Sequence, residues 1–243
     1  MTSLVEARGV GIAARLSPTD LAVERGQMVA VIGPNGGGKT SLLRALARTE
    51  DAGGTVTIDG QDVDSTNEAQ RRRLLAYLPA AREAHWPVAV TDYLRFGLGT
   101  PDPARIAELV ELLELAPLAV RPIDQLSTGE RARAMLGRAI AGRASLLLLD
   151  EPLSNLDPYW VLRTIEIVRA EIAANESSAL VSVHDLSVLA RFDRVLLVNN
   201  GAVIADDPPG KVLDSATFGA VFRVEQNECG WAITPQADPR SSP

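Results

Sequence analysis

Cysteine and aromatic residues are scarce in this chain of 243 residues. Cys229 is the only cysteine, which excludes a disulfide within the chain and a cysteine cluster for a metal. Phenylalanine, tryptophan and tyrosine are 4% of the residues, and Tyr77 is the first of them. Nothing before Tyr77 therefore offers an aromatic ring for stacking on a ligand.

A basic excess and long hydrophobic runs are also lacking. The net charge is −7, which argues against a protein that binds nucleic acid or lies on a membrane through basic residues. No run approaches the roughly 20 apolar residues that span a bilayer, and the first residues, MTSLVEARG, lack the pattern of a signal peptide. We expect a reducing, cytosolic compartment, with any role at a membrane coming through a partner chain.

One glycine-rich stretch stands out, GPNGGGKT at residues 33–40. It fits the pattern G-x-x-x-x-G-K-[ST] of a phosphate-binding P-loop. The apolar run Met28–Ile32 before it is typical of a buried strand, and Ser41–Arg48 after it is rich in helix formers. This strand–loop–helix order favours a P-loop over a chance glycine-rich turn, because main-chain N–H groups and a helix N-terminus would then surround a phosphate.

The P-loop pattern also predicts individual contacts. Lys39 is expected to reach the β- and γ-phosphates of a nucleotide, and the Thr40 hydroxyl to ligate Mg²⁺. The residues predicted to bind the nucleotide are Gly33, Pro34, Asn35, Gly36, Gly37, Gly38, Lys39, Thr40 and Ser41.

Polar side chains follow two further apolar runs. Asp150 and Glu151 come directly after Ser145–Leu149, and His184 comes directly after Ala179–Val183. Ligands bind at the carboxyl ends of strands in open α/β sheets. We therefore expect Asp150 to hold Mg²⁺, Glu151 to polarise the attacking water and His184 to sense the γ-phosphate. The structural alternatives are two carboxylates that cap the next helix and an ordinary histidine.

Two predicted helices have capping residues at their starts. Ser127 to Glu130 (STGE) matches the capping box S-x-x-E ahead of a predicted helix. The same hydroxyl and glycine N–H would suit an anion, so a capped helix and a ligand site both stay open here. Asp157 is a plausible N-cap, since Pro158 follows it.

Strand and helix patterns divide the chain into parts. We expect an α/β core from residues 1–79 and 145–225, and a helical subdomain inserted at residues 80–144. Residues 226–243 read as a C-terminal extension with a disordered tail. An Asn-Gly hairpin turn is predicted at residues 199–201. Helices are predicted over residues 65–76, 91–97, 105–115, 131–143, 158–174 and 208–222.

Five motifs stand in one order: GPNGGGKT at 33–40, LSTGE at 126–130, LLLLDEP at 146–152, SNLD at 154–157 and His184. Through them, residues 4–225 resemble the ATP-binding cassette (ABC) transporter ATPases. The resemblance implies a P-loop NTPase (RecA-like) core with a mainly parallel sheet, an antiparallel β subdomain and an inserted α-helical subdomain. It also implies an enzyme that binds ATP with Mg²⁺ and hydrolyses the ATP to power transport.

The resemblance assigns roles to the motif residues. Two cassettes would pair head to tail as a homodimer, with ATP at Lys39 and Thr40 of one capped by the signature of the other. Glu151 would be the catalytic base, His184 would contact the γ-phosphate, and Asp157 would couple the two sites. The signature residues are Ser127, Thr128, Gly129 and Glu130.

The resemblance further implies a chain held at the cytoplasmic face of the membrane by integral permease subunits. An importer would also need an extracytoplasmic substrate-binding protein, and no nucleic acid partner is expected. Residues 77–86 correspond to the segment that meets the coupling helices of the permease. Residues 129–141, 184–209 and 222–225 look most like the ATPases of siderophore-iron, haem and cobalamin importers.

Three positions depart from the family pattern. Residues 10–16 lack the aromatic side chain that usually stacks on adenine, Ala80 stands where glutamine is usual, and Thr128 replaces a glycine. The first two departures leave open a degenerate cassette that binds nucleotide as a regulatory subunit with weak or no hydrolysis. A soluble, non-transport ABC ATPase is the other alternative, which the lack of a basic face disfavours.

Overall fold

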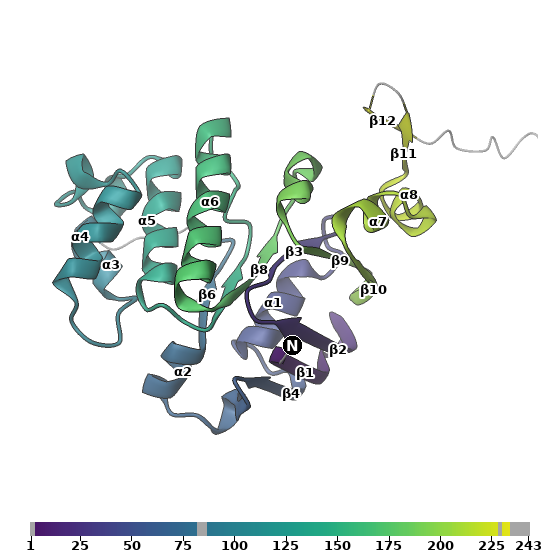
Figure 1. Ribbon diagram of the computed structural model, residues 1–243, viewed down its shortest axis with the longest axis horizontal. Coiled ribbons are helices and arrows are strands. Elements are labelled where there is room, and N and C mark those ends of the chain that lie inside the picture. Colours follow the sequence, from purple (N-terminus) through teal and green to yellow (C-terminus); the bar gives the residue numbers. More distant parts are fainter. Residues whose placement is uncertain (1–2, 82–86, 228–229, 234–243) are drawn as a thin grey trace, which may run out of the picture.

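A six-stranded sheet forms the centre of the computed structural model, which describes residues 3–81, 87–227 and 230–233 (Figure 1). The strand order is β10-β9-β3-β8-β7-β6, parallel except for the outer pair β9–β10. The strands are β3 (Met28–Ile32), β6 (Leu75–Leu78), β7 (Leu146–Leu149), β8 (Ser178–Ser182), β9 (Arg194–Asn199) and β10 (Ala202–Asp207). Every residue of β3, β7 and β8 is buried, as expected for parallel strands covered on both faces.

A second, antiparallel sheet has the order β2-β1-β4-β5. Its strands are β1 (Ser3–Ile12), β2 (Leu16–Glu24), β4 (Gly53–Ile58) and β5 (Gln61–Asp62). Helix α1 (Lys39–Ala47) lies between the two sheets, because Leu42, Leu43 and Leu46 share one apolar cluster with residues of β1 and β3. Alternate residues of β3 point to opposite faces, so Val29 and Val31 join this cluster while Ala30 faces the other side.

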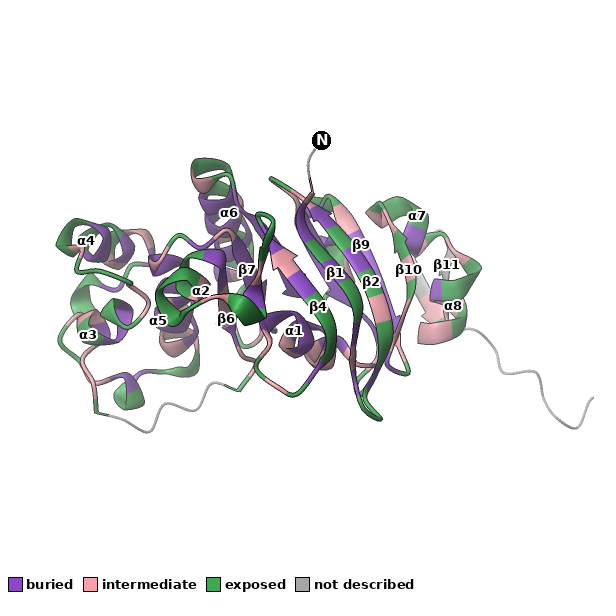
Figure 2. Ribbon diagram, turned by 90° about the horizontal axis from the view of Figure 1, so that it is seen from below, coloured by how far each residue is buried: buried purple, intermediate pink, exposed green. Residues whose placement is uncertain are grey.

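The remaining helices lie around the large sheet, and most of them pack on its other face or beyond its two ends (Figure 1). They are α2 (Glu68–Leu74), α3 (Val90–Arg95), α4 (Pro103–Leu112), α5 (Thr128–Ala141), α6 (Pro158–Asn175), α7 (Pro209–Leu213) and α8 (Ala216–Phe222). Short 3₁₀ turns lie at Val63–Ser65, Ala116–Leu118, Ile123–Gln125 and Leu186–Arg191, and a hairpin joins β11 (Val224–Asn227) to β12 (Gly230–Ile233). Figure 2 shows buried residues along the strands and the inward faces of the helices. None of the helices in the described part of the chain is long and apolar enough to cross a membrane.

A buried ion pair joins α4 to α6. The Arg105 side chain is 2% exposed, and its Nη2 lies 2.6 Å from Glu171 Oε2. The same nitrogen donates to the Ile140 carbonyl of α5 at 3.0 Å. Three helices from distant parts of the sequence therefore meet at one guanidinium.

The fold confirms the predicted α/β class, with a mainly parallel sheet, an antiparallel sheet and added helices. The predicted helix over residues 65–76 is wrong at its end, because residues 75–78 form β6 and pair in parallel with β7. The predicted helix over 208–222 is two helices, since Ser215 caps α8 by accepting from the Phe218 N–H. The division into residues 1–79, 80–144 and 145–225 stays a prediction.

Some sequence predictions lie outside the described residues. Cys229, the C-terminal tail from residue 234 and part of the coupling segment, residues 82–86, belong to this group.

Candidate active site

The P-loop connects β3 to α1 and folds around its own lysine. The Lys39 side chain is buried, and its Nζ donates to the carbonyl oxygens of Gly33 at 2.9 Å and Pro34 at 3.2 Å. Burial lowers the pKa of Lys39, while the nearby carboxylates of Glu151 and Asp150 act in the opposite direction. The ammonium thus lies among carbonyl and carboxylate oxygens, in a position to exchange them for phosphate oxygens.

The β9–β10 hairpin packs against the main chain of the P-loop. Gly33 has φ +153°, and a Cβ there would lie 2.0 Å from the Val198 carbonyl oxygen. A Cβ on Gly38, at φ +111°, would lie 3.0 Å from the Gly201 Cα. The Gly201 N–H donates to the Gly37 carbonyl at 2.9 Å. Glycine is required at these positions because the hairpin backbone leaves no room for a side chain.

A pocket of about 540 Å³ opens over the P-loop and contains Glu151. Its lining residues are Ala14, Arg15, Asn35, Gly36, Gly37, Gly38, Lys39, Thr40, Ser41, Glu151, Asn200 and Gly201. Most of the predicted nucleotide-binding residues therefore share one cavity.

Asp150 is buried at the end of β7. Its Oδ1 accepts a hydrogen bond from Ser182 Oγ at 2.7 Å, whereas its Oδ2 is buried with no hydrogen-bond partner among the residues described. A buried carboxylate oxygen without a partner is costly unless something binds it. This oxygen and the Thr40 hydroxyl are the hard donors that Mg²⁺ prefers, so the residues fit the ion.

Glu151 and His184 contact each other across the strand ends. His184 Nε2 donates to Glu151 Oε1 at 2.7 Å, and Ser154 Oγ donates to Glu151 Oε2 at 3.1 Å. Burial acts to raise the pKa of Glu151, but the hydrogen bond and charge of His184, together with Ser154 and Lys39, lower it overall. Glu151 is therefore ionised at neutral pH and able to accept a proton.

The signature residues form the start of α5 and do not line the P-loop pocket. The Ser127 Oγ accepts from the Glu130 N–H at 3.3 Å, and Glu130 Oε2 accepts from the Ser127 N–H at 2.8 Å, which completes a capping box. Ser127 and Thr128 are exposed. Asp157 caps α6, because its Oδ1 accepts from the Trp160 N–H at 2.9 Å. Both structural interpretations are thus confirmed, and the surface of the signature remains available to a partner.

Sequence reasoning did not identify two contributors to the site. Ser182 binds Asp150 Oδ1 and also accepts from the Glu151 N–H at 2.7 Å. Its only local signal was that it is the single polar residue of the predicted strand Ala179–Val183. Asn200 and Gly201 were predicted as a hairpin turn, but no local pattern places that turn against the P-loop.

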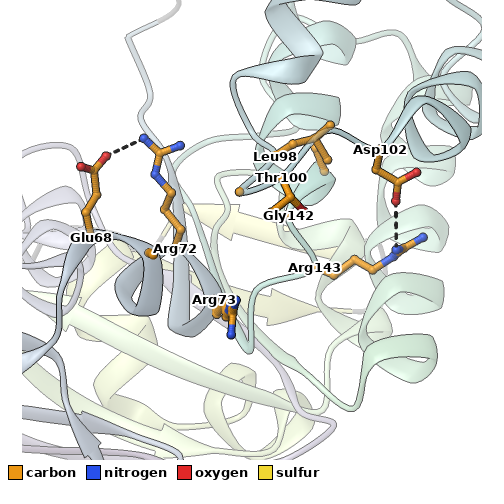
Figure 3. A pocket seen from close by; sticks show the side chains of 11 residues that line it. Glu68, Arg72, Arg73, Leu98, Thr100, Asp102, Gly142 and Arg143 are labelled. Atoms are coloured by element: carbon orange, nitrogen blue, oxygen red, sulfur yellow. Dashed lines mark hydrogen bonds and ion pairs between the residues drawn. The ribbon is translucent and has the colours of Figure 1, made fainter.

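A second pocket, of about 560 Å³, lies apart from the P-loop between α2 and the C-terminal end of α5 (Figure 3). Arg72 and Arg73 form one wall and Arg143 stands opposite. Arg72 pairs with Glu68 at 2.5 Å and Arg143 with Asp102 at 3.8 Å. The Arg73 side chain makes no hydrogen bond or ion pair with any residue that the structure describes. We call this pocket the arginine groove.

Comparison with known proteins gives matches over most of the chain. The model of the ABC transporter family matches residues 16–154. A hemin import ATP-binding protein of Streptomyces coelicolor is 35% identical over 217 residues, which is 85% of this chain and 77% of the relative. A hemin import ATP-binding protein of Pseudomonas entomophila is 39% identical over 225 residues, which is 86% of this chain and 87% of the relative. A cobalamin import ATP-binding protein of Halobacterium salinarum is 35% identical over 219 residues, and the chain spans 54% of that relative.

Solved structures share the fold. A nucleotide-free ATP-binding cassette from an ABC transporter has a TM-score of 0.78 at 19% identity, covering 91% of this chain and 99% of that one. A dimeric ATP-binding cassette bound to ADP and phosphate has a TM-score of 0.75 at 20% identity, covering 84% of this chain and 98% of that one.

Proposed function

Since this chain belongs to the ABC transporter family as an ATP-binding subunit that hydrolyses ATP, we propose that it powers the import of a metal chelate. The chelate would be of the siderophore-iron, haem or cobalamin type. Support comes from relatives that are named for hemin and cobalamin import and that match about 85% of the chain. The observation that carries the hydrolytic role is the ionised Glu151, hydrogen bonded to His184 beside the P-loop pocket.

The geometry supports a division of labour in hydrolysis. Main-chain N–H groups of the P-loop and the Lys39 ammonium would hold the phosphates. Thr40 and Asp150 would hold Mg²⁺, which supplies positive charge to the transferring phosphoryl group. Glu151 would accept the proton of the attacking water, while His184 keeps the carboxylate in place and contacts the γ-phosphate. Ala80 has no group to join this set, so the proton transfer rests on Glu151.

A second copy of the chain would complete the site. Within one chain, the exposed Ser127 and the half-buried Gly129 do not line the pocket that Lys39 lines. In a head-to-tail homodimer they would cap the ATP of the partner copy, with Asp157 coupling the two sites. The solved relative that is a dimer bound to ADP and phosphate is consistent with this arrangement.

Permease subunits would hold the chain at the cytoplasmic face of the membrane and contact the segment from Tyr77 to residue 86. We place a second part of this contact in the arginine groove, because Arg73 offers an uncompensated positive charge there. An extracytoplasmic binding protein would deliver the chelate to the permease.

The test compares wild type with Glu151→Gln, which keeps the shape of the side chain but removes the base. We expect ATP hydrolysis to fall by about 10²- to 10⁴-fold while ATP still binds, since general-base catalysis contributes about this much. Glu166→Gln is the matched control. Glu166 is exposed on α6, and its Oε2 makes one long ion pair, 3.6 Å from Arg163 Nη1.

Equal rates in wild type and Glu151→Gln would contradict the role of Glu151. Bound ATP without measurable hydrolysis in wild type would instead support the degenerate, regulatory cassette.

A further inference from the structure

The P-loop pocket has a phosphate end and an opposite end. Lys39, Thr40 and Glu151 mark the first, whereas Ala14 and Arg15 line the pocket at the turn between β1 and β2. Gly201 lies between the two ends: its N–H binds the Gly37 carbonyl, and a Cβ on it would lie 2.6 Å from the Arg15 carbonyl oxygen. A nucleotide with its phosphates on Lys39 would therefore extend its base toward Arg15.

Another cavity, of about 580 Å³, adjoins the P-loop pocket at this end. It shares Ala14, Arg15, Asn200 and Gly201 with the P-loop pocket and extends along the β1–β2 turn to residues such as Gly11 and Pro18. Most of its lining residues are small, and Ile12 and Leu16 add larger apolar side chains. The cavity is large enough to hold a nucleotide base. Of the residues that line both cavities, only Arg15 carries a long side chain with a planar end.

Glu50 holds the Arg15 guanidinium at this junction. The two side chains form an ion pair, and Glu50 also accepts from Arg44 Nη1 at 2.7 Å. The Arg15 side chain is still 52% exposed. An ion pair uses the N–H edge of a guanidinium, so the contact with Glu50 does not itself occupy the flat faces of Arg15.

We propose that the guanidinium plane of Arg15 is the surface on which the nucleotide base stacks. Arginine stacks on bases through its delocalised plane, and its charge attracts their π-electrons. Arg15 thereby takes over a role for which no aromatic residue is available before Tyr77. Glu50 is a positioning residue for that plane. This inference rests on the nucleotide binding described above.

The test separates base contacts from phosphate contacts by using two ligands that are not hydrolysed here, ADP and inorganic pyrophosphate. Dissociation constants are measured by calorimetry with Mg²⁺ at 0.15 M salt. Arg15→Ala and Arg15→Lys are expected to weaken ADP about three- to tenfold and to change pyrophosphate less than twofold. Arg15→Tyr, which restores a plane without the charge, is expected to bind ADP at least as tightly as wild type. Arg8→Ala is the control, since Arg8 is an exposed arginine of β1 paired with Glu6.

Three results would overturn the proposal. Arg15→Lys behaving like wild type would mean that charge alone acts. Equal weakening of ADP and pyrophosphate would mean that Arg15 contacts phosphate. Unchanged ADP binding in Arg15→Ala would mean that the base lies elsewhere. Failure of wild type to bind either ligand would instead reject the nucleotide-binding function itself.

Discussion

Glu130 is a single residue whose charge stabilises the start of α5. The hydrogen bond from the Ser127 main-chain N–H lowers the pKa of the Glu130 carboxyl, and the Ser127 side chain adds to this. A carboxyl with a lower pKa in the folded chain than in the unfolded chain stabilises the fold above its unfolded pKa. That contribution is lost as the pH falls through the folded pKa.

We therefore expect the difference in free energy of unfolding between wild type and Glu130→Gln to be smaller in acid than at neutral pH. Glutamine keeps the capping-box acceptor, so at pH 7 the variant should lose only a few tenths of a kcal/mol, because the site is largely exposed. Urea unfolding at pH 7 and pH 3.5 measures both differences. The control is Glu111→Gln on α4, where the Glu111 side chain makes no hydrogen bond or ion pair with the described residues. A Glu130→Gln difference that grows in acid would contradict the expectation.

Single residues of the site differ in how far the sequence predicts them. Lys39, Glu151 and His184 each belong to a local pattern at the end of an apolar run, and the structure brings them together. Ser182 and Arg15 belong to no such pattern. Their contacts come from strands and turns that are distant in the sequence, so only the fold shows them.

Gly97, just after α3, allows close packing against α5. A Cβ on Gly97 would lie 2.0 Å from the Arg138 carbonyl oxygen and 2.9 Å from the Ala141 Cβ. The first of these atoms is main chain and cannot rotate away, so a side chain here pushes the two helices apart.

Gly97→Ala is accordingly expected to lower the free energy of unfolding by on the order of 2–3 kcal/mol. Gly99→Ala is a matched control two residues further on, because a Cβ on Gly99 meets nothing within 4 Å. Urea denaturation of the two variants against wild type makes the comparison. Equal stability of both variants would show that α3 and α5 can separate without cost.

Elements with clear end signals were predictable from the sequence. Helix α6 has both an N-cap, Asp157, and Pro158 at its first position, and it begins where predicted. Strand β6 was missed because it has only four residues and follows α2 directly, with no turn between Leu74 and Leu75. Its identity as a strand comes from pairing with β7, a contact that local patterns do not contain.

At the scale of the whole molecule, the arginine groove is the surface that we propose as a permease contact. Arg73→Glu is expected to reduce recovery of co-expressed permease subunits in affinity purification by at least about threefold, as reversing an interfacial charge disfavours the complex. ATP hydrolysis by the isolated chain should stay unchanged. Arg8→Glu, on the distant β1, is the control and should recover the permease like wild type. Unchanged recovery with Arg73→Glu would exclude the groove as a permease contact.

For the whole molecule, the order of strands and helices predicted an α/β core with an inserted helical subdomain, and the resemblance to the ABC ATPases implied the antiparallel sheet. It did not predict that the β9–β10 turn supports the P-loop, because the residues in contact lie more than 160 positions apart, as between Gly37 and Gly201. Such contacts follow from the strand order β9-β3-β8, which places β9 beside the P-loop strand.

The contact between that turn and the P-loop has a consequence for the entropy of ligand binding. Gly37 is hydrogen bonded to Gly201, and Gly33 lies against Val198, so folding itself fixes the shape of the loop. Arranging the phosphate-facing N–H groups then costs little conformational entropy when the ligand arrives. Preorganisation of this kind saves about the same free energy for every ligand with a phosphate chain, whatever its base. Discrimination among nucleotides is thereby left to the far end of the pocket.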